Sequence, residues 1–418
     1  MASGCPKGWQ LVKLGDLGEV NRGRSRHRPR YAEHLYGGPY PFVQTGDIRE
    51  SGGRITSYKQ TYSESGLAQS RMWPSGTMCI TIAANIAETA ILTFPACFPD
   101  SIVGFVADES KCEVRFVEYM FRFLKRRIQH EASGSVQDNI NLGTLDRLWF
   151  PLPPLTEQRI IVHILGTLDD KIELNRRMNA TLEGMARTIF KSWFVDFDPV
   201  GAKAAELCDE GILEIGDGYR AKNSEFGAEG LPFARAGNLN SGFDLEGADR
   251  LCLASVAKAA SKISQHGDVA FTSKGTVGRI ARVDESAPQF VYAPQVCFWR
   301  SKNRTKLHPA VLYCWMSSDD FAGQVRSFSG QTDMAPYISL SDQRRILVPR
   351  FPESQIELGD RIDILVNRKA LCVRESRSLA TVRDALLPRL LSGKLSLVKE
   401  TRFHGNTALI RKKSTAVK

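Results

Sequence analysis

Apolar residues recur at helical spacing over two long stretches of the chain, one near its middle and one near its C-terminus. In the first stretch they return every three or four positions from Glu157 to Phe194, and no proline interrupts them. The prolines of "PLPP" (residues 151–154) bar a helix immediately before it. The pattern predicts one helix of roughly 55 Å, at about 1.5 Å per residue, with Thr156 as its N-cap.

A heptad seam runs along this helix and returns in the second stretch. In the first helix the seam positions are Ile161, Leu165, Leu168, Ile172, Asn175, Asn179, Leu182, Ala186, Ile189 and Trp193. The positions 197 residues later are Leu358, Ile362, Leu365, Lys369, Cys372, Ser376, Leu379, Arg383, Leu386 and Leu390. Most positions of both seams are apolar, and both seams turn polar near their middle. The seams predict a coiled coil, which must be antiparallel because the first helix leads into the segment from which the second helix departs.

The antiparallel direction fixes which seam residues meet. It places Asn175 near Ser376 and Asn179 near Cys372, where a polar layer would set the register at some loss of stability. The alternative is that each helix is amphipathic and packs only on its own domain. The matched polar interruptions of the two seams favour the mutual pairing.

Short motifs before the two long helices repeat in the same order. Phe42 of "YPFVQTGDI" corresponds to Phe233 of "LPFARAGNL", 191 residues later. "SGTMCIT" corresponds to "HGDVAFT" at the same offset, and "SGSVQDNIN" corresponds to "SGQTDMAPYIS" at an offset of 196. Gln158 of "TEQ" corresponds to Gln355 of "ESQ" at an offset of 197. Four matches in one order at a nearly constant offset predict a pseudo-two-fold internal repeat.

Each repeat carries a mixed pattern before its long helix. "TMCITIA" and "DVAFTSK" are typical of short strands, and "FPDSIVGFVA" and "APQVCFWR" of buried strands. "EVRFVEYMFRFLKRRIQH" has helical spacing, and "HPAVLYCWMSSDDFAGQVRSF" is its counterpart. The predicted fold class is therefore α+β, with two tandem α/β domains separated by two long helices. The boundaries are 1–154 and 199–351 for the domains, 155–198 and 352–394 for the helices, and 395–418 for a basic tail that we expect to be mostly disordered.

The charge of the chain adds a direction to this picture. A net charge of +10 and a pI near 9.1 favour a polyanionic partner or an acidic membrane surface. The chain contains no run of about eighteen apolar residues, so no transmembrane helix is predicted. "MASGCPKGWQ" lacks the apolar segment of a secretory signal. The cysteines form no CxxC pair and no zinc spacing, which predicts reduced thiols in a cytoplasmic protein.

The chain carries no recognisable catalytic motif. The GxxxxGK[ST] phosphate loop, HExxH and GxSxG are absent, as is the Asn/Asp-Pro-Pro-aromatic tetrapeptide of a methyltransferase that flips a base. Asp169 and Asp170 are consecutive on a helix, so they do not face each other as a carboxylate dyad. We therefore expect no catalytic residue, no metal site and no bound cofactor in this chain.

One arginine-rich segment is a candidate for contact with nucleic acid. "NRGRSRHRPRY" contains no acidic residue and holds Arg22, Arg24, Arg26, Arg28 and Arg30. Arginine neutralises phosphate groups or reads guanine through two hydrogen bonds. The alternative is a mobile arginine-rich loop without a fixed partner.

The repeated motifs keep their frame while their polar residues change. The candidates for contact with DNA are Gln44, Thr45, Asp47, Asn85, Gln137 and Asn139 in the first repeat, and Arg235, Asn238, Lys274, Thr276, Gln331 and Thr332 in the second. Gln, Asn, Arg and Lys are side chains that pair with base edges in the major groove. The alternative for any one of them is a structural role in its loop. Different polar residues on one scaffold predict recognition of two different short sequences, and therefore a site that is not palindromic.

Several of these motifs together resemble a known family. They are "PLPPLTEQRII" and "TIFKSWFVDFDPV" around the first long helix, "PESQ" and "LLPRLLSGKLSL" around the second, and "PFVQTGDI", "FPDSIVGF", "GLPFARAGNL" and "APQVCFW" in the repeats. The chain resembles the specificity (S) subunits of type I restriction-modification systems over nearly its whole length, to about Val398. It departs from the family at Ser354, where an acidic residue is usual.

The resemblance implies a division of labour among subunits. Two target-recognition domains, at opposite ends of an antiparallel coiled coil, each read one half of an asymmetric bipartite DNA site, and the coiled coil sets their spacing. Two modification subunits join the S subunit to form an adenine methyltransferase that uses S-adenosylmethionine. Two motor-nuclease subunits, which use ATP and Mg, complete the restriction enzyme for host defence. The S subunit itself is not catalytic.

Two other functions fit parts of the pattern. One is a scaffold with two binding modules on a coiled coil that gathers protein partners instead of DNA. The other is an enzyme with an unrecognised site between the domains. Binding to DNA that weakens steeply with salt would distinguish the first from DNA recognition. Methylation by this chain alone would favour the second.

Overall fold

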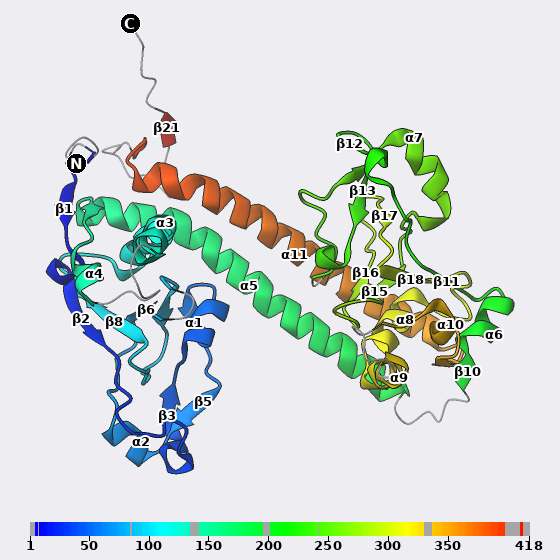
Figure 1. The fold of residues 1–418 in the computed structure, drawn as a ribbon, viewed down its shortest axis with the longest axis horizontal. Helices are drawn as coiled ribbons and strands as arrows, with labels where there is room; N and C mark the ends of the chain where they lie inside the picture. The colour runs from blue at the N-terminus through cyan, green and yellow to red at the C-terminus, as the bar shows by residue number, and fades with distance from the viewer. Residues whose placement is uncertain are drawn as a thin grey trace, which may run out of the picture. The chain divides into compact units, whose positions relative to one another are not determined.

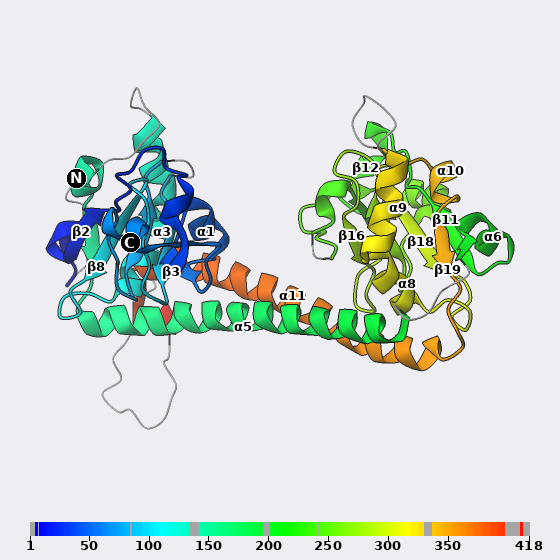
Figure 2. The same cartoon turned by 90° about the horizontal axis from the view of Figure 1, so that it is seen from below.

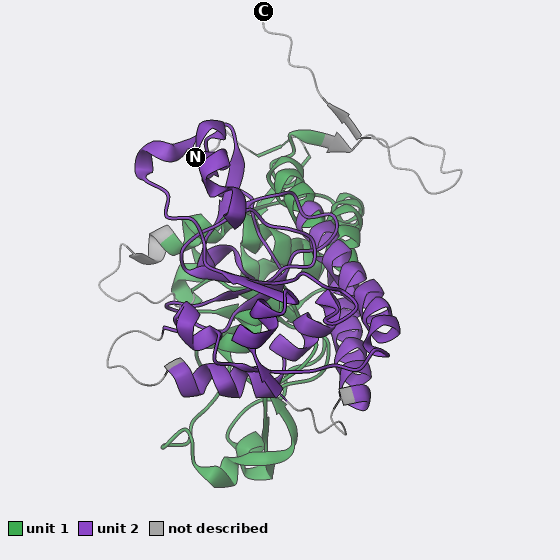
Figure 3. Cartoon of the chain, turned by 90° about the vertical axis from the view of Figure 1, so that its right-hand side faces the viewer, with its two compact units in different colours: residues 1–171, 379–418 green, residues 172–378 purple. Residues whose placement is uncertain are grey.

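The structure is a computed structural model that describes residues 5–6, 8–83, 86–133, 142–194, 201–240, 242–329, 337–397 and 410–412. It has a mixed α and β fold that divides into two compact units (Figure 1). Unit 1 comprises residues 1–171 and 379–418, and unit 2 comprises residues 172–378 (Figure 3). The long helices α5 (Leu155–Phe194) and α11 (Gln355–Leu391) each contribute one half to each unit.

Unit 1 is built around a five-stranded sheet in the order β2-β8-β6-β7-β4, against which α3 packs (Figure 1). The sheet is antiparallel except for the pair β4–β7. Its strands, with those of the small sheets β1–β9, β3–β5 and β20–β21, are β1 (Gln10–Val12), β2 (Gly18–Arg22), β3 (Tyr36–Phe42), β4 (Arg54–Ile55), β5 (Gln60–Tyr62), β6 (Met78–Thr81), β7 (Thr89–Leu92), β8 (Ile102–Ala107), β9 (Phe150–Leu152), β20 (Leu395–Leu397) and β21 (Ile410–Lys412). Its shorter helices are η1 (Leu14–Asp16), η2 (Glu33–Leu35), α1 (Thr45–Glu50), α2 (Glu64–Ala68), α3 (Val114–Ser133) and α4 (Leu142–Asp146).

Unit 2 contains two four-stranded sheets, in the orders β11-β18-β15-β16 and β12-β14-β13-β17. Helices α8 and α9 pack against the first of these sheets (Figure 2). The strands are β10 (Gly201–Lys203), β11 (Leu213–Gly216), β12 (Phe226–Gly227), β13 (Leu231–Ala234), β14 (Arg250–Leu251), β15 (Val269–Thr272), β16 (Ile280–Arg282), β17 (Val291–Tyr292), β18 (Val296–Ser301) and β19 (Leu347–Pro349). The shorter helices are α6 (Ala204–Asp209), η3 (Asn223–Glu225), η4 (Ala236–Asn238), α7 (Leu253–Val256), η5 (Ala257–Lys262), α8 (Pro309–Met316), α9 (Asp319–Ser329) and α10 (Leu340–Gln343).

The strands predicted in the two repeats are present as β6, β8, β15 and β18, and the first predicted helix is α3. Gly76 and Gly267 enter β6 and β15 with φ of +85° and +88°, a conformation that favours glycine. The counterpart of α3 differs from the prediction of one helical segment, because it consists of α8 and α9. The chain breaks there because Ser318 starts a new helix: its side-chain oxygen accepts the N–H of Phe321 at 3.5 Å.

The ends of the long helices correct two expectations. The prediction that Thr156 caps α5 is wrong, because the helix begins at Leu155 and the carbonyl of Pro154 accepts the N–H groups of Glu157 and Gln158 at 2.8 and 3.0 Å. Trp193 was placed in the seam, but its side chain is 46% exposed.

The tail after the second long helix also differs from its prediction. Residues Leu395–Leu397 pair in antiparallel direction with Ile410–Lys412, so β20 and β21 form a regular hairpin ladder. The expectation of a mostly disordered tail is therefore wrong for these two segments. The other tail positions lie outside the described residues.

Candidate nucleic-acid interface

The arginine-rich segment continues an edge strand of the unit 1 sheet. β2 occupies one end of the strand order and pairs with β8. Gly23 prolongs this pairing, since its N–H donates to the carbonyl of Ile102 at 2.8 Å. A side chain at Gly23 would begin 2.3 Å from the carbonyl oxygen of Pro99, so only glycine fits this close approach.

Exposed and buried side chains alternate along this extension. Arg22, Arg24 and Arg26 are exposed, whereas Gly23 and Ser25 are buried. Successive side chains of an extended chain point to opposite faces, so alternate residues share a face at a spacing of roughly 6.6 Å. We call Arg22, Arg24 and Arg26 the arginine row.

The last two arginines of the segment hold the segment itself in place. Arg30 forms an ion pair with Asp100 at 2.9 Å. Arg28 donates to the carbonyls of Ser25 and His27 at 2.7 and 2.8 Å. These contacts compete with any role of Arg28 and Arg30 toward a ligand, and they give the segment a defined conformation.

The arginine row is less occupied by contacts within the chain. The Nε of Arg22 donates to the backbone carbonyl of Asp100 at 3.0 Å, and its terminal nitrogens have no hydrogen-bond partner among the described residues. Within the described residues, the guanidinium groups of Arg24 and Arg26 have no hydrogen-bond or ion-pair partner. Their charges are therefore available to a ligand.

The matching segment of unit 2 follows β11, and backbone contacts align it with the segment of unit 1. Arg24 donates its N–H to the carbonyl of Phe98 at 3.1 Å, and Tyr219 donates its N–H to the carbonyl of Tyr292 at 2.7 Å. Gly218 takes the place of Gly23, because a side chain there would begin 2.1 Å from the carbonyl oxygen of Ala293.

This alignment replaces the arginine row with Asp217, Tyr219 and Ala221. Asp217 accepts a hydrogen bond from Lys262 at 2.8 Å, and the hydroxyl of Tyr219 donates to Glu225 at 3.0 Å. The two units therefore share a backbone geometry at this edge and differ in its charge.

Two predicted candidates have structural roles that the repeat conserves. The side chain of Asp47 accepts the N–H of Gln44 at 2.9 Å, and that of Asn238 accepts the N–H of Arg235 at 2.8 Å. The amide of Asn238 also donates to the carbonyl of Asp244 at 2.7 Å. Both groups of the Asn238 side chain are thus engaged within its own turn, which fits the structural alternative better than contact with a base.

Arg235 is held by its surroundings from two sides. Its guanidinium forms an ion pair with Asp249 and lies 5.6 and 5.5 Å from the ring centroids of Phe226 and Phe233. The side chain of its counterpart Gln44 donates to Gln60. A polar side chain fixed in this way presents a defined hydrogen-bonding face.

The other candidates are placed less closely. Thr45 begins α1, Lys274 is exposed, and the carbonyl of Thr276 accepts a hydrogen bond from the hydroxyl of Thr272. Within the described part of the chain, no hydrogen bond or ion pair joins Lys274 or Thr276 to Arg235. Five candidates lie outside the described residues: Asn85, Gln137, Asn139, Gln331 and Thr332.

A buried glutamine fixes each domain to its long helix, and this role was not predicted. Gln158 accepts the N–H of Glu113 at 2.9 Å and donates to the carbonyl of Lys111 at 3.3 Å. Gln355 accepts the N–H of His308 at 3.0 Å and donates to the carbonyl of Lys306 at 2.7 Å.

Both of these glutamine side chains are fully buried, and each satisfies the backbone at the start of α3 or α8. The repeat at an offset of 197 was the signal that marked the pair, but the sequence did not show which groups they would bind.

Unit 2 contains residues 172–194 of α5 and 355–378 of α11, and the seam positions of these two segments approach each other in antiparallel direction. The amide of Asn175 donates to Glu375 at 2.9 Å and lies 3.3 Å from the hydroxyl of Ser376, the neighbour that the antiparallel register predicted. Lys369 pairs with Glu183 at 2.8 Å. The amide oxygens of Asn175 and Asn179 are buried without a partner among the described residues.

Nearer the C-terminal end of α5, Ala186 shares a hydrophobic cluster with Leu358 and Ile362 of α11. The sulfur of Cys372 lies 3.5 Å from that of Met178, one position before Asn179, so the predicted meeting of Asn179 with Cys372 stays a prediction.

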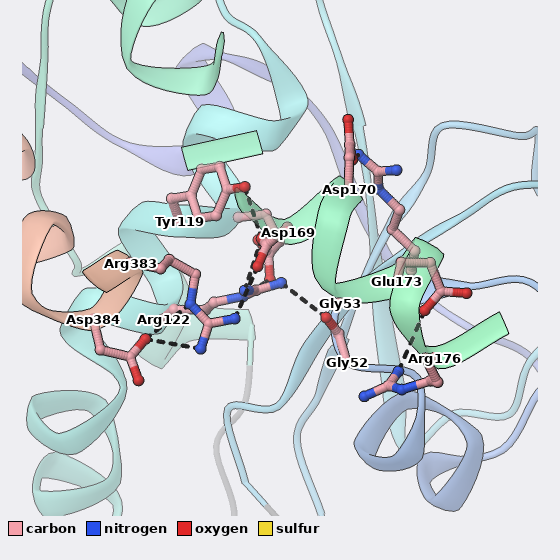
Figure 4. A network of polar contacts seen from close by, with 12 residues as sticks. Gly52, Gly53, Tyr119, Arg122, Asp169, Asp170, Glu173, Arg176, Arg383 and Asp384 are labelled. Carbon is pink, nitrogen blue, oxygen red and sulfur yellow. Dashed lines mark hydrogen bonds and ion pairs between the residues drawn. The ribbon is translucent and has the colours of Figure 1, made fainter. Parts of the chain in front are cut away.

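The seam halves within unit 1 are joined by a charged network (Figure 4). Asp169 of α5 accepts hydrogen bonds from Arg383 of α11 at 2.8 Å and from the hydroxyl of Tyr119 of α3 at 2.8 Å. Arg122 lies 3.3 Å from the same carboxylate and also pairs with the buried Glu118. Ile161 and Leu165 join the core of unit 1 with Leu390 and Leu391.

Burial and the neighbouring arginines act in opposite directions on the pKa values of the carboxyl groups in this network. Burial alone disfavours the charged form of Asp169, but the guanidinium of Arg122 and the hydrogen bond from Arg383 outweigh it and hold the pKa of this carboxyl below its usual value. Burial raises the pKa of Glu118, which Arg122 only partly offsets. The network therefore depends on the ionised Asp169 for its stability.

Comparisons with known proteins find similarity to one family. The family model of the type I restriction modification DNA specificity domain matches residues 6–184. A type I restriction enzyme specificity subunit of Methanocaldococcus jannaschii (MjaIX) is 25% identical to this chain, over 93% of this chain and 94% of the relative. The chain is thus similar to type I restriction enzyme specificity subunits, within residues 6–184 to the family model and over nearly its whole length to the relative from M. jannaschii.

Two further proteins are similar to this chain, one in part of its sequence and one in its fold. The HindI specificity subunit of Haemophilus influenzae is 38% identical, over 26% of each chain. The crystal structure of a type I restriction-modification S subunit from M. genitalium shares the fold, with a TM-score of 0.61 at 17% identity, over 91% of this chain and 96% of that one.

The described residues also bear on a metal site and on a membrane-spanning helix. No group of three or more His, Cys, Asp and Glu side chains among them is arranged to hold a metal ion. No helix in the described part of the chain combines the length and the apolar character needed to span a membrane.

Proposed function

We propose that this chain recognises an asymmetric, bipartite DNA site and directs the methyltransferase and endonuclease subunits of a type I restriction-modification complex to it. The observation that carries the proposal is the repeat itself: the two units share their backbone frame and differ in the polar side chains that they expose. The arginine row of unit 1 and the Asp217, Tyr219 and Ala221 of unit 2 illustrate the difference. The similarity to type I specificity subunits supports the same interpretation.

The two long helices act in this proposal as the spacer between two target-recognition domains. We assign residues 1–154 and 199–351 to the domains, 155–198 and 352–394 to the spacer helices, and 395–418 to the tail. The contacts of Asn175 with Ser376 and of Asp169 with Arg383 support an antiparallel coiled coil. At about 1.5 Å per residue, helices of this length exceed one DNA turn of roughly 34 Å.

The partners follow from the family. Two modification subunits supply the adenine-N6 methyltransferase and bind S-adenosylmethionine, and two restriction subunits supply the motor nuclease with ATP and Mg. This chain contributes recognition and no catalytic group. The exposed parts of the seam helices are the proposed surface for the modification subunits.

Mapping N6-methyladenine in the genome of the host tests the proposal. We expect one bipartite motif with two different halves, and we expect its methylation to disappear when this chain is deleted. Restoring the chain should restore the same motif. Unchanged methylation after deletion would contradict the proposal.

A second experiment separates DNA recognition from a protein scaffold. Gel shifts with the mapped duplex should show binding that weakens steeply as salt rises, because bound phosphates release counterions. A chain that binds no duplex at any salt concentration would favour the scaffold.

A further inference from the structure

We infer that the arginine row of unit 1 (Arg22, Arg24 and Arg26) binds the phosphate backbone of DNA and does not read bases, and that the matching positions of unit 2 (Asp217, Tyr219 and Ala221) do not bind it in this way. This inference rests on the proposed DNA-binding function and deepens it, because it assigns a chemistry to one edge of one unit. The sequence left open whether these arginines meet phosphates or guanine.

The first argument is how the five arginines divide their contacts. Arg28 and Arg30 are engaged by backbone carbonyls and by Asp100. Arg24 and Arg26 have no partner among the described residues, and both are exposed. Two cations that satisfy nothing in their own fold are available to a polyanion.

The second argument is the lack of support for a base-reading geometry. Recognition of guanine needs both terminal nitrogens of a guanidinium aimed at two acceptors, and such a side chain is usually oriented by its neighbours. Arg235 of unit 2 has that support from Asp249 and from two aromatic rings. Arg24 and Arg26 have no such support, so they act as mobile charges, which suffices for phosphate.

The third argument is the backbone on which the row stands. The segment continues the edge strand β2 and is fixed by the N–H of Gly23 and by that of Arg24. Alternation along this extended backbone sets the three cations on one face at regular intervals. A regular row of charges suits a partner whose own charges recur regularly along a strand.

The comparison with unit 2 makes the inference specific to one half of the site. The matching positions hold Asp217, which Lys262 neutralises, and Tyr219, which Glu225 engages. Unit 1 should therefore contribute more of the salt-dependent affinity than unit 2, at equal backbone geometry.

The test is the salt dependence of binding by the full chain, in the assembly in which it purifies. Three duplexes serve as probes: one of random sequence, the mapped motif, and the mapped motif with a single-base change in the half read by unit 1. For Arg24→Ala/Arg26→Ala, we expect the slope of log affinity against log salt to fall by about 1.8, since each phosphate contact contributes about 0.9. The ratio of affinities for matched and mismatched duplexes should stay the same.

A lysine variant separates phosphate contact from base reading. Arg24→Lys/Arg26→Lys keeps both charges but loses the planar fork, so it should retain the slope and the ratio of the unaltered chain. Arg147→Ala, an exposed arginine of unit 1 in the connection after α4, is the matched control and should leave both measurements unchanged.

Each outcome has one meaning. An unchanged slope in the alanine variant, or a lost ratio in the lysine variant, would overturn the inference while DNA binding itself persists. Absence of DNA binding by the unaltered chain would overturn the proposed function and the inference together.

Discussion

The two units share the backbone contacts that attach α3 or α8 to a long helix, but they differ in the side chains between these elements. Gln158 and Gln355 align α3 with α8, since they bind Glu113 and His308 in the same way. Nine residues further, Arg122 of unit 1 corresponds to Ser317 of unit 2. The offset of 197 matches Asp169 with Val366, and Ala186 with Arg383.

Where unit 1 has a network of charges, the corresponding part of unit 2 has an apolar groove. The groove has a volume of about 480 Å³ and is lined by Ala186, Phe190, Tyr313, Cys314 and Val366, among others. The groove is open because the small side chains of Ser317 and Ala186 occupy the positions of Arg122 and Arg383 in unit 1. The repeat therefore preserves the backbone anchors and leaves the chemistry between them free to diverge.

Gly53 leaves room for the Arg122 side chain of the charged network in unit 1. A side chain at Gly53 would begin 1.7 Å from a terminal nitrogen of Arg122, and its φ of +104° is one that glycine tolerates. In unit 2 a glycine of α11 is crowded by a polar side chain: a side chain at Gly359 would begin 2.2 Å from the ring of His308. Each unit has its own close approach, placed beside its own polar group.

The largest expected effect tests whether the charged network holds unit 1 together. Asp169→Ala leaves Arg122 and Arg383 without their shared carboxylate, so we expect unit 1 to lose about 3 kcal/mol in its free energy of unfolding. Urea unfolding, with hydrogen exchange to locate the loss, measures the effect. Val366→Ala, the matching change in unit 2, removes only apolar contacts and should cost about 1 kcal/mol.

The neighbouring carboxylate is the control for this change. Asp170 pairs with Arg54 and Arg115 but is half exposed. Asp170→Ala should cost less than about 1 kcal/mol, because exposed ion pairs contribute little. Equal losses from the two variants would contradict the distinction between them.

The second prediction tests what the two units share. Gln158→Ala and Gln355→Ala each remove the buried side chain that binds a backbone N–H and backbone carbonyls at the start of α3 or α8, so each should destabilise its own unit by about 2 kcal/mol. The two losses should be similar and confined to different units in hydrogen exchange. Very unequal losses would show that the repeat conserved the residue without conserving its role.

The sequence predicted the features that depend on period and order. Helical spacing located α3, α5 and α11, and the antiparallel direction of the two seams placed Asn175 beside Ser376. It missed the role of Asp169, which was considered only as half of a carboxylate dyad with Asp170. That role depends on α3 and α11 reaching the same point of α5, and no local pattern encodes such a tertiary contact.

The candidate interface was predictable only in part for a similar reason. The arginine run was visible as a run, but its division depends on Asp100, which is 70 residues from Arg30 in the chain. The capping roles of Asp47 and Asn238 depend on turn geometry that several polar residues can adopt equally well. The repeated glycines before β6 and β15 were correctly marked because a positive φ leaves few alternatives.

A smaller effect should distinguish the units as pH falls. His308 is buried and its Nδ1 accepts the N–H of Ala310 at 3.1 Å. Burial, and then the guanidinium of Arg304, hold the pKa of His308 below its usual 6.5, although Asp360 and Asp363 oppose the shift. The unfolded chain takes up a proton first, so stability due to this site is lost as the pH falls below about 6.5.

Unit 1 carries Glu113 at the corresponding position and should lack this dependence. Urea unfolding between about pH 7 and about pH 5 should show a loss in unit 2 that His308→Asn reduces, because Asn keeps an acceptor but does not titrate. The lowered pKa of Asp169 affects unit 1 only at more acidic pH, below its ordinary value of 3.8. A pH dependence that is identical in the variant would rule out His308 as its source.

The smallest expected effect on stability concerns the polar layer of the seam. The amide of Asn175 donates to Glu375 and Ser376, but its oxygen is buried without a partner among the described residues. Because gain and loss nearly cancel, Asn175→Leu with Ser376→Leu should change the free energy of unfolding by less than about 1 kcal/mol.

The larger consequence of this double change should be in the pairing of the helices. An apolar seam permits several alignments, whereas one buried polar contact excludes all but one. A cysteine introduced at Leu182 and tested against cysteines along α11 should crosslink at one position in the parent chain and at several in the double variant. A single crosslinking position in both would mean that the domains, through anchors such as Gln158 and Gln355, fix the register without help from Asn175.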